Sequence, residues 1–240
     1  MALKFVLLIV ASIQIVAIQS AQFIIRNNIP GPIEVGIQGN PGHAHLNNGG
    51  FHLNQGQEVT VDAADNWAGR FWAKTWCVNG RCQTGDCGNR VQCAGAGGVP
   101  PATLVEITLR GYGNQDFYDV SLVDGFNVLA TISPVGGQGN CQTVSCNTNL
   151  NWGCPDDLKK IGGNGNDVIA CYSSCMKYKT DQFCCRGSFN NPNVCKPHNM
   201  PQPNSGGHFK GNCPQYYSYA YDDATSTFTC LASVYRITFS

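Results

Sequence analysis

Hydrophobic and polar residues alternate along several short stretches of this chain, and β-branched residues are frequent in them. A two-residue period is typical of a strand with one buried face, whereas a helix repeats its buried face every three to four residues. The pattern predicts strands near residues 23–25, 33–37, 58–62, 71–76, 104–109, 116–123 and 234–239. Pro30-Gly31-Pro32 separates the first two and indicates a hairpin or a sharp connection.

Helix signals are scarce. The best lies at residues 167–179, where Asp167 stands in a capping position and Val168, Cys171, Cys175 and Tyr178 recur at three- and four-residue steps. Many short strands and one short helix predict a mainly β fold built around a β-sandwich.

The chain has 14 cysteines, and none precedes Cys77. An even number allows complete pairing, and so many thiols are typical of exported proteins. Zinc sites are the competing interpretation, but the chain lacks a CxxC pair and its five histidines stand mostly apart from the cysteines. We therefore expect disulfides.

Cysteine density and composition also divide the chain. Residues 76–94 form a small cysteine-rich segment, and residues 148–213 form a larger one that is rich in Gly, Asn and Pro. Neither segment has enough apolar residues for its own core, so we expect each to be a domain held by disulfides. The sandwich domain would then comprise residues 21–75, 95–147 and 214–240.

The first twenty residues have the pattern of a secretory signal. Lys4 is followed by an apolar run, and Ser20 and Ala21 are small residues suited to cleavage after either one. A membrane anchor would need about 20 unbroken apolar residues, and Ser12, Gln14 and Gln19 interrupt this run. We expect a secreted, extracellular protein with no stable membrane anchor.

The charge balance narrows the choice of partner. Without Lys4 the chain keeps 14 of its 15 basic residues and all 15 acidic residues, so its net charge is near −1. A nearly neutral chain without a basic run is a poor electrostatic partner for nucleic acid.

Acidic residues concentrate where the strand pattern is clearest, at Glu106, Asp116, Asp119 and Asp124. Strand alternation can direct Glu106 and Asp119 to one side, and Asp124 stands in the turn that follows. Two interpretations remain open: a functional carboxylate cluster, or solvent-facing strand residues with a turn aspartate before Gly125.

Four segments resemble the signatures of the thaumatin-like protein family, in family order: residues 82–93 (CQTGDCGNRVQC), 100–106 (PPATLVE), 116–128 (DFYDVSLVDGFNV) and 217–230 (YSYAYDDATSTFTC). The resemblance extends from about residue 22 to the end of the chain. It implies a central β-sandwich, a disulfide-rich second domain, a small third domain, and a cleft between the first two.

The resemblance also implies a disulfide pattern. Typical members have sixteen cysteines, and the two missing positions correspond here to Ile29 and Ser240. The implied pairs are 77–82, 87–93, 141–230, 146–213, 154–171, 175–184 and 185–195.

For function, the resemblance implies an acidic cleft whose residues correspond to Arg70, Glu106, Asp119, Asp124 and Asp223. It suggests an antifungal defence protein that binds β-1,3-glucan of the fungal cell wall. One alternative is a weak endo-β-1,3-glucanase, with Glu106 as the acid and Asp119 or Asp124 as its partner. Others are a protein inhibitor of a secreted hydrolase and an ice- or surface-active variant.

Other residues carry weaker signals. Phe117, Tyr118 and Phe126 flank the acidic residues and could stack on sugars. His43-Ala44-His45 has no acidic residue or third histidine nearby that would complete a metal site, so we expect an exposed loop and no metal there. We also expect no cofactor and a monomer. The tyrosines of residues 216–221 fit core packing better than sugar stacking.

Overall fold

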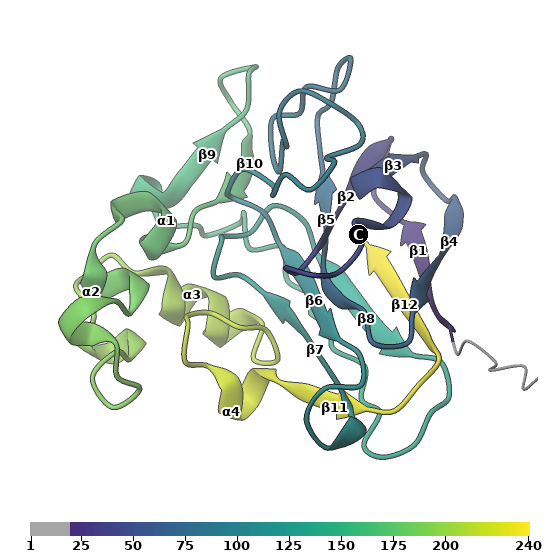
Figure 1. Cartoon of the computed structure of the whole chain (residues 1–240). Helices are drawn as coiled ribbons and strands as arrows, with labels where there is room; N and C mark the ends of the chain where they lie inside the picture. Colours follow the sequence, from purple (N-terminus) through teal and green to yellow (C-terminus); the bar gives the residue numbers. More distant parts are fainter. Residues whose placement is uncertain (1–19) are drawn as a thin grey trace, which may run out of the picture.

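The computed structural model describes residues 20–240, so the predicted signal segment, Ser20 excepted, lies outside the described residues. Two sheets face each other (Figure 1). The first has the order β4 (Glu58–Ala64), β1 (Ser20–Asn27), β12 (Val234–Phe239), β8 (Ala130–Pro134). The second has the order β11 (Phe228–Cys230), β7 (Asp116–Ser121), β6 (Leu104–Thr108), β5 (Ala68–Lys74), β2 (Ile33–Gly39), β3 (Gly50–Leu53).

Alternating strand residues build the core between these sheets. Phe23 of β1 packs against Phe71 of β5, with ring centroids 4.8 Å apart, and both side chains are fully buried. Val105 of β6 and Tyr235 of β12 are buried as well. Because β1 and β2 belong to different sheets, the turn at residues 30–32 is a sharp connection between sheets and not a hairpin. The fold is thus mainly β, as predicted.

The predicted helix at residues 167–179 is wrong in its first half. Residues Val168–Cys171 form β10, which pairs with β9 (Lys159–Ile161) in a small two-stranded sheet. The helix α1 begins later and spans Ser174–Tyr178. Ser173 caps it by accepting a hydrogen bond from Met176 N at 3.1 Å, so Asp167 is not its cap.

The remaining helices are also short. They are α2 (Asp181–Cys184), α3 (Ser205–Asn212) and α4 (Asp223–Ser226). The 3-10 helices are Leu46–Gly49, Tyr112–Asn114, Asp156–Leu158, Gly187–Phe189 and Pro197–Asn199. No helix among residues 20–240 is long and apolar enough to cross a membrane.

Disulfides hold the parts of the chain that contain little regular structure. The pairs are Cys77–Cys82, Cys87–Cys93, Cys141–Cys230, Cys146–Cys213, Cys154–Cys171, Cys175–Cys184 and Cys185–Cys195. These are the pairs that the family resemblance implies, and no cysteine of the described chain is free.

The helices α1–α4 and the β9–β10 hairpin lie on one side of the six-stranded sheet (Figure 1). Hydrogen bonds fix them to the segment that follows β7: Phe126 N donates to Cys171 O at 2.8 Å, and Ser173 Oγ donates to Val123 O at 2.6 Å. Side chains of β5, β6 and β7 line a hollow together with the segment after β7 and with Tyr217 and Ala220, which precede α4.

Candidate functional site

Strand register brings three charged side chains into one row. Arg70 of β5 pairs with Glu106 of β6, and Glu106 pairs with Asp119 of β7. Residues directly opposite in neighbouring strands point to the same face, with Cβ atoms about 4.5–5.5 Å apart. The Arg70 Nε atom lies 3.5 Å from Glu106 Oε1, and the two side chains are 36% and 32% exposed.

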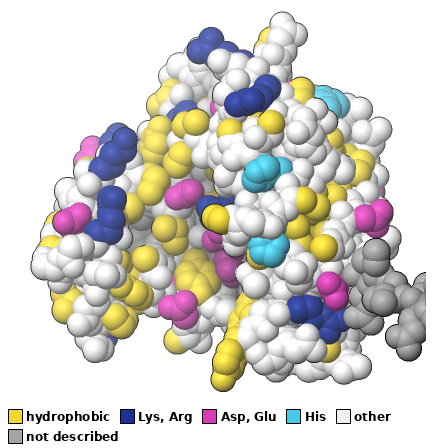
Figure 2. Space-filling model, viewed as in Figure 1, with side chains coloured by type: hydrophobic (Ala, Val, Ile, Leu, Met, Phe, Trp, Pro, Cys, Tyr) yellow, Lys and Arg dark blue, Asp and Glu magenta, His cyan; other side chains and the backbone are white. Residues whose placement is uncertain are grey.

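The turn after β7 adds a fourth member. Asp124 lines the same hollow as the row, together with Val123 of the same turn and Tyr217 from the chain between α3 and α4. The hollow has a volume of about 390 Å³ and is open to solvent. Figure 2 shows acidic side chains along the depression between the helical part and the sheet.

Burial and crowding alter the acidity of these carboxyls. Burial raises the pKa of Glu106, which Arg70 opposes and Asp124 reinforces. Burial raises the pKa of Asp119 well above its ordinary value, and the charges of Glu106 and Asp223 add to the effect. Burial also raises the pKa of Asp124, and Arg70 opposes this. The row therefore holds protons at a pH where free carboxyls would be ionised.

Two buried polar atoms in the row lack hydrogen bonds to the rest of residues 20–240. They are Arg70 Nε, a donor, and Asp119 Oδ1, an acceptor. Unmade hydrogen bonds of this kind are unfavourable for the fold and are typical of places where a ligand binds.

Asp222 and Asp223 are adjacent but serve different purposes. Asp222 is buried, accepts hydrogen bonds from Ser218 N and Oγ at 2.9 Å each, and lies 3.0 Å from Lys210 Nζ. Asp223 accepts a hydrogen bond from Tyr217 Oη at 2.9 Å, and its charge acts on Asp119. Asp223 thus belongs to the electrostatic surroundings of the row, whereas Asp222 organises the turn.

Asp116 stands apart from this group, although the sequence places it in the same acidic cluster. It is buried on the core side of β7 and accepts hydrogen bonds from Tyr235 Oη at 2.6 Å, Ala232 N at 3.0 Å and Arg110 N at 2.9 Å. Its position is three residues before Asp119, so the two side chains lie on opposite faces of the strand.

The aromatic residues expected beside the acidic cluster do not line the hollow. Tyr118 and Phe126 are fully buried in the core, and Phe117 packs near Gly111. The aromatic side chain that lines the hollow is Tyr217, which we had predicted to pack in the core with the other tyrosines of residues 216–221. Tyr216 does pack in the core, where its hydroxyl donates to Ala130 O.

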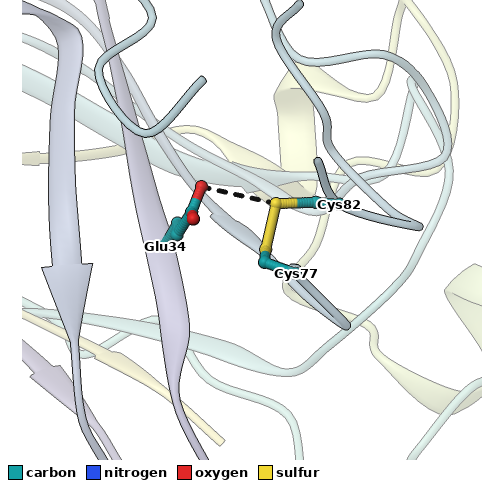
Figure 3. A group of neighbouring side chains, drawn as sticks. All are labelled: Glu34, Cys77 and Cys82. Carbon is teal, nitrogen blue, oxygen red and sulfur yellow. Dashed lines mark hydrogen bonds between the residues drawn. A yellow bond between two sulfur atoms is a disulfide. The ribbon is translucent and has the colours of Figure 1, made fainter. Parts of the chain in front are cut away.

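The remaining candidates have structural partners. His45 Nδ1 accepts a hydrogen bond from Gly39 N at 3.1 Å. Glu34, Cys77 and Cys82 cluster together, but the two sulfurs are bonded to each other, and Cys82 Sγ lies 3.4 Å from Glu34 Oε2 (Figure 3). Glu34 is also paired with the buried Lys74 at 2.8 Å. This cluster joins the loop after β5 to the sheet and offers no free thiolate.

The row contains several kinds of hydrogen-bonding partner for a ligand that is rich in hydroxyl groups. Carboxylate oxygens accept hydrogen bonds, the Arg70 guanidinium donates them, and carboxyls with raised pKa values can also donate a proton. An open, polar hollow with one aromatic side chain suits a carbohydrate better than an apolar ligand.

Comparison with known proteins identifies the family of the chain. The profile of the Thaumatin family matches residues 27–240. Pathogenesis-related protein 5 of Arabidopsis thaliana is 48% identical over 229 residues, which cover 93% of this chain and 92% of the relative. A Prunus avium protein named glucan endo-1,3-beta-glucosidase is 43% identical over 221 residues, covering 89% of this chain and 88% of that protein.

A solved structure has a similar fold. The laminaripentaose-producing β-1,3-glucanase, in complex with laminaritetraose, superposes with a TM-score of 0.61 at 11% identity, covering 92% of this chain and 99% of that one. The family profile and the close relatives span nearly the whole described chain, so the protein belongs to the thaumatin family.

Proposed function

We propose that this protein is an extracellular antifungal defence protein that binds β-1,3-glucan through the cleft between the six-stranded sheet and the helices. The observation that supports this most strongly is the row Arg70, Glu106 and Asp119, which strand register holds in an open hollow. Fourteen disulfide-bonded cysteines are consistent with secretion.

The unmade hydrogen bonds of the row favour binding. A glucan hydroxyl could accept from Arg70 Nε and donate to Asp119 Oδ1, the two buried atoms of the row that make no hydrogen bond within the described chain. The rigid sheet positions both atoms before the ligand arrives, which lowers the entropic penalty of binding. The similarity to a relative named as a glucanase makes β-1,3-glucan the leading substrate class.

Weak endo-β-1,3-glucanase activity is a second candidate, favoured by the raised pKa values. Glycoside cleavage needs one protonated carboxyl as acid and one carboxylate as nucleophile or base. Burial raises the pKa of both carboxyls, but it raises that of Asp119 well above the ordinary value, and Glu106 is the one paired with Arg70. Asp119 is then the better acid and Glu106 the better carboxylate, which reverses the roles that we assigned from the sequence.

Incubation with insoluble β-1,3-glucan tests both candidates when bound protein and released reducing sugar are measured together. We expect the parent to sediment with the glucan, and Glu106→Gln and Asp119→Asn to sediment less. Both substitutions keep size and polarity but remove the carboxyl, and with it the charge or the proton that it carries. Sugar release that these variants lose would establish the glucanase activity as well.

Matched controls are available on β4. Glu58 is a strand glutamate paired with Arg236, and Asp62 is an exposed strand aspartate, and both lie outside the cleft. Glu58→Gln and Asp62→Asn should bind glucan as the parent does. Equal binding by the cleft variants and the parent would show that the cleft is not the site. A parent that neither binds nor releases sugar would refute both candidates and favour an inhibitor of a secreted hydrolase.

A further inference from the structure

A second large hollow lies away from the acidic cleft. It has a volume of about 620 Å³, within the range of ligand pockets, and shares no lining residue with the cleft. Its walls come from the turn at residues 29–33, the loop at 75–78, the segment 149–151, and the start of β10. We call it the Trp76 pocket.

One wall of the Trp76 pocket is apolar and exposed. Trp76 is 61% exposed and Val78 is 71% exposed, which is unusual for such side chains, and Ile29 and Pro32 continue the surface. Aromatic and aliphatic faces of this kind cover the C–H faces of a sugar ring, which are apolar although the ring edge is hydroxylated.

The polar lining offers unused hydrogen-bonding groups. Gln83 accepts from Gly163 N at 2.8 Å through Oε1, and its Nε2 has no partner among residues 20–240. Asn149 accepts from Asn151 N at 3.0 Å through Oδ1, which leaves its Nδ2 available. Asn151 Oδ1 is a buried acceptor without a donor in the described chain. Donors and acceptors are thus both present, as hydroxyl groups require.

The charge of the lining indicates a neutral ligand. The lining residues include no Lys, Arg or His, and Asp167 is the single carboxylate. A phosphate or other anion would lack a cationic partner here, and a cationic ligand would meet only one carboxylate. Amide side chains beside an exposed indole favour a neutral, hydroxylated ligand.

The walls are held in place before any ligand arrives. Asn27 fixes the turn by donating to Gly31 O at 2.9 Å and accepting from Ile29 N at 2.8 Å. Trp76 has a left-handed backbone (φ 57°), which is uncommon for a bulky residue, and the adjacent Cys77–Cys82 bond restrains it. Strained residues that neighbouring structure holds in place are concentrated at ligand sites.

We propose that the Trp76 pocket is a second carbohydrate site that binds a neutral oligosaccharide, with Trp76 stacking on a ring and Gln83 and Asn149 donating to hydroxyls. This site is independent of the acidic cleft. Two sites on one chain would allow one protein molecule to hold a polysaccharide at two points, which strengthens retention on an insoluble polymer.

Calorimetric titration of the full-length mature protein tests the proposal. The probes are laminarihexaose, a β-1,3-linked glucose oligomer, and chitohexaose, a β-1,4-linked N-acetylglucosamine oligomer, and both are neutral. The titration uses a Glu106→Gln, Asp119→Asn background, so that the Trp76 pocket is measured without the acidic cleft. We expect binding of at least one probe, weakened at least tenfold by Trp76→Ala.

Trp152→Ala is the matched control, because Trp152 is 77% exposed and does not line the pocket. It should change affinity by less than twofold. Val78→Asp is a second pocket variant at a highly exposed position, and the added charge should also weaken binding at least tenfold. Circular dichroism of each variant establishes that it folds.

The outcomes separate this proposal from the proposed function. The second site is overturned if the cleft-variant background binds neither probe. It is also overturned if Trp76→Ala and Val78→Asp both leave the affinity unchanged. Glucan binding by the parent, with no binding of either probe in the cleft-variant background, would leave the acidic cleft in place and refute the Trp76 pocket.

Discussion

The disulfide Cys141–Cys230 should stabilise the fold less than its sequence separation of 89 suggests. Counted alone, the bond closes a loop of about 90 residues, and the chain-entropy relation then gives about 4.6 kcal/mol at 25 °C. The bond is not alone, however, because Cys146–Cys213 lies inside that loop and shortens the path between its ends.

With Cys146–Cys213 intact, the closed path includes only residues 141–146 and 213–230. This ring contains about 24 residues, for which the same relation gives about 3.5 kcal/mol. The bond Cys77–Cys82 closes a ring of about six residues and should contribute about 2.2 kcal/mol. Removal of the first bond by Cys141→Ala and Cys230→Ala should therefore lower the free energy of unfolding more than Cys77→Ala with Cys82→Ala.

Guanidinium denaturation without reductant measures both losses, followed by the fluorescence of Trp67 and Trp72, which are 1% and 0% exposed. We expect a loss near 3.5 kcal/mol for the Cys141–Cys230 variant and a smaller loss for the other. A loss for Cys77–Cys82 that equals or exceeds that for Cys141–Cys230 would refute the ring-size argument.

Three further predictions concern buried charge, acidity and the chain termini. Lys74→Met should lower the free energy of unfolding by about 3–5 kcal/mol because it leaves the buried Glu34 without its partner, and Glu34→Gln in addition should recover part of the loss in the same denaturation assay. The pKa of Asp119 is higher in the folded than in the unfolded chain, so protonated Asp119 favours folding below its unfolded pKa, and this stability is lost as pH rises through the folded pKa. Asp119→Asn, which keeps a neutral side chain at every pH, should therefore raise the melting temperature at pH 7 and leave it unchanged at pH 3. A melting temperature that is unchanged at both pH values would contradict the assignment. Asn28 N donates to Phe239 O at 2.7 Å, which brings the neighbouring Ile29 and Ser240 together. Ile29→Cys with Ser240→Cys should therefore form an eighth disulfide and raise the melting temperature. Two thiols that stay reduced in an oxidising medium would show that these positions do not correspond to the family's missing cysteine pair.

Sequence alternation predicted strands such as β1 and β12, because each has one face in the core and one toward solvent, whereas β2 and β5 are buried on both faces and were recognised as runs of apolar residues. The short strands β3, β8, β9, β10 and β11 have three to five residues and too little pattern to be recognised. The segment at 167–179 has helical spacing, but pairing of β10 with β9 overrides it before Ser173 starts the helix. The disulfide pairs depended on the family resemblance, since spacing alone allows many pairings.

The site, too, was predicted only in part from the sequence. Residue types predicted a carboxylate cluster, but the strands decided its members. Alternation within β7 directs Asp116 into the core and away from Asp119. Strand register aligns Glu106 with Arg70 and Asp119. Register depends on hydrogen bonds between strands distant in sequence, which no local pattern shows. Tyr217 was missed for a similar reason, because only the fold separates it from the buried Tyr216.

A crystal structure of the protein with laminarihexaose would test the central claim most directly. The account predicts sugar density over β5, β6 and β7, with hydroxyls within hydrogen-bonding distance of Arg70, Glu106 and Asp119. Density confined to another surface, with the cleft empty at saturating oligosaccharide, would contradict it.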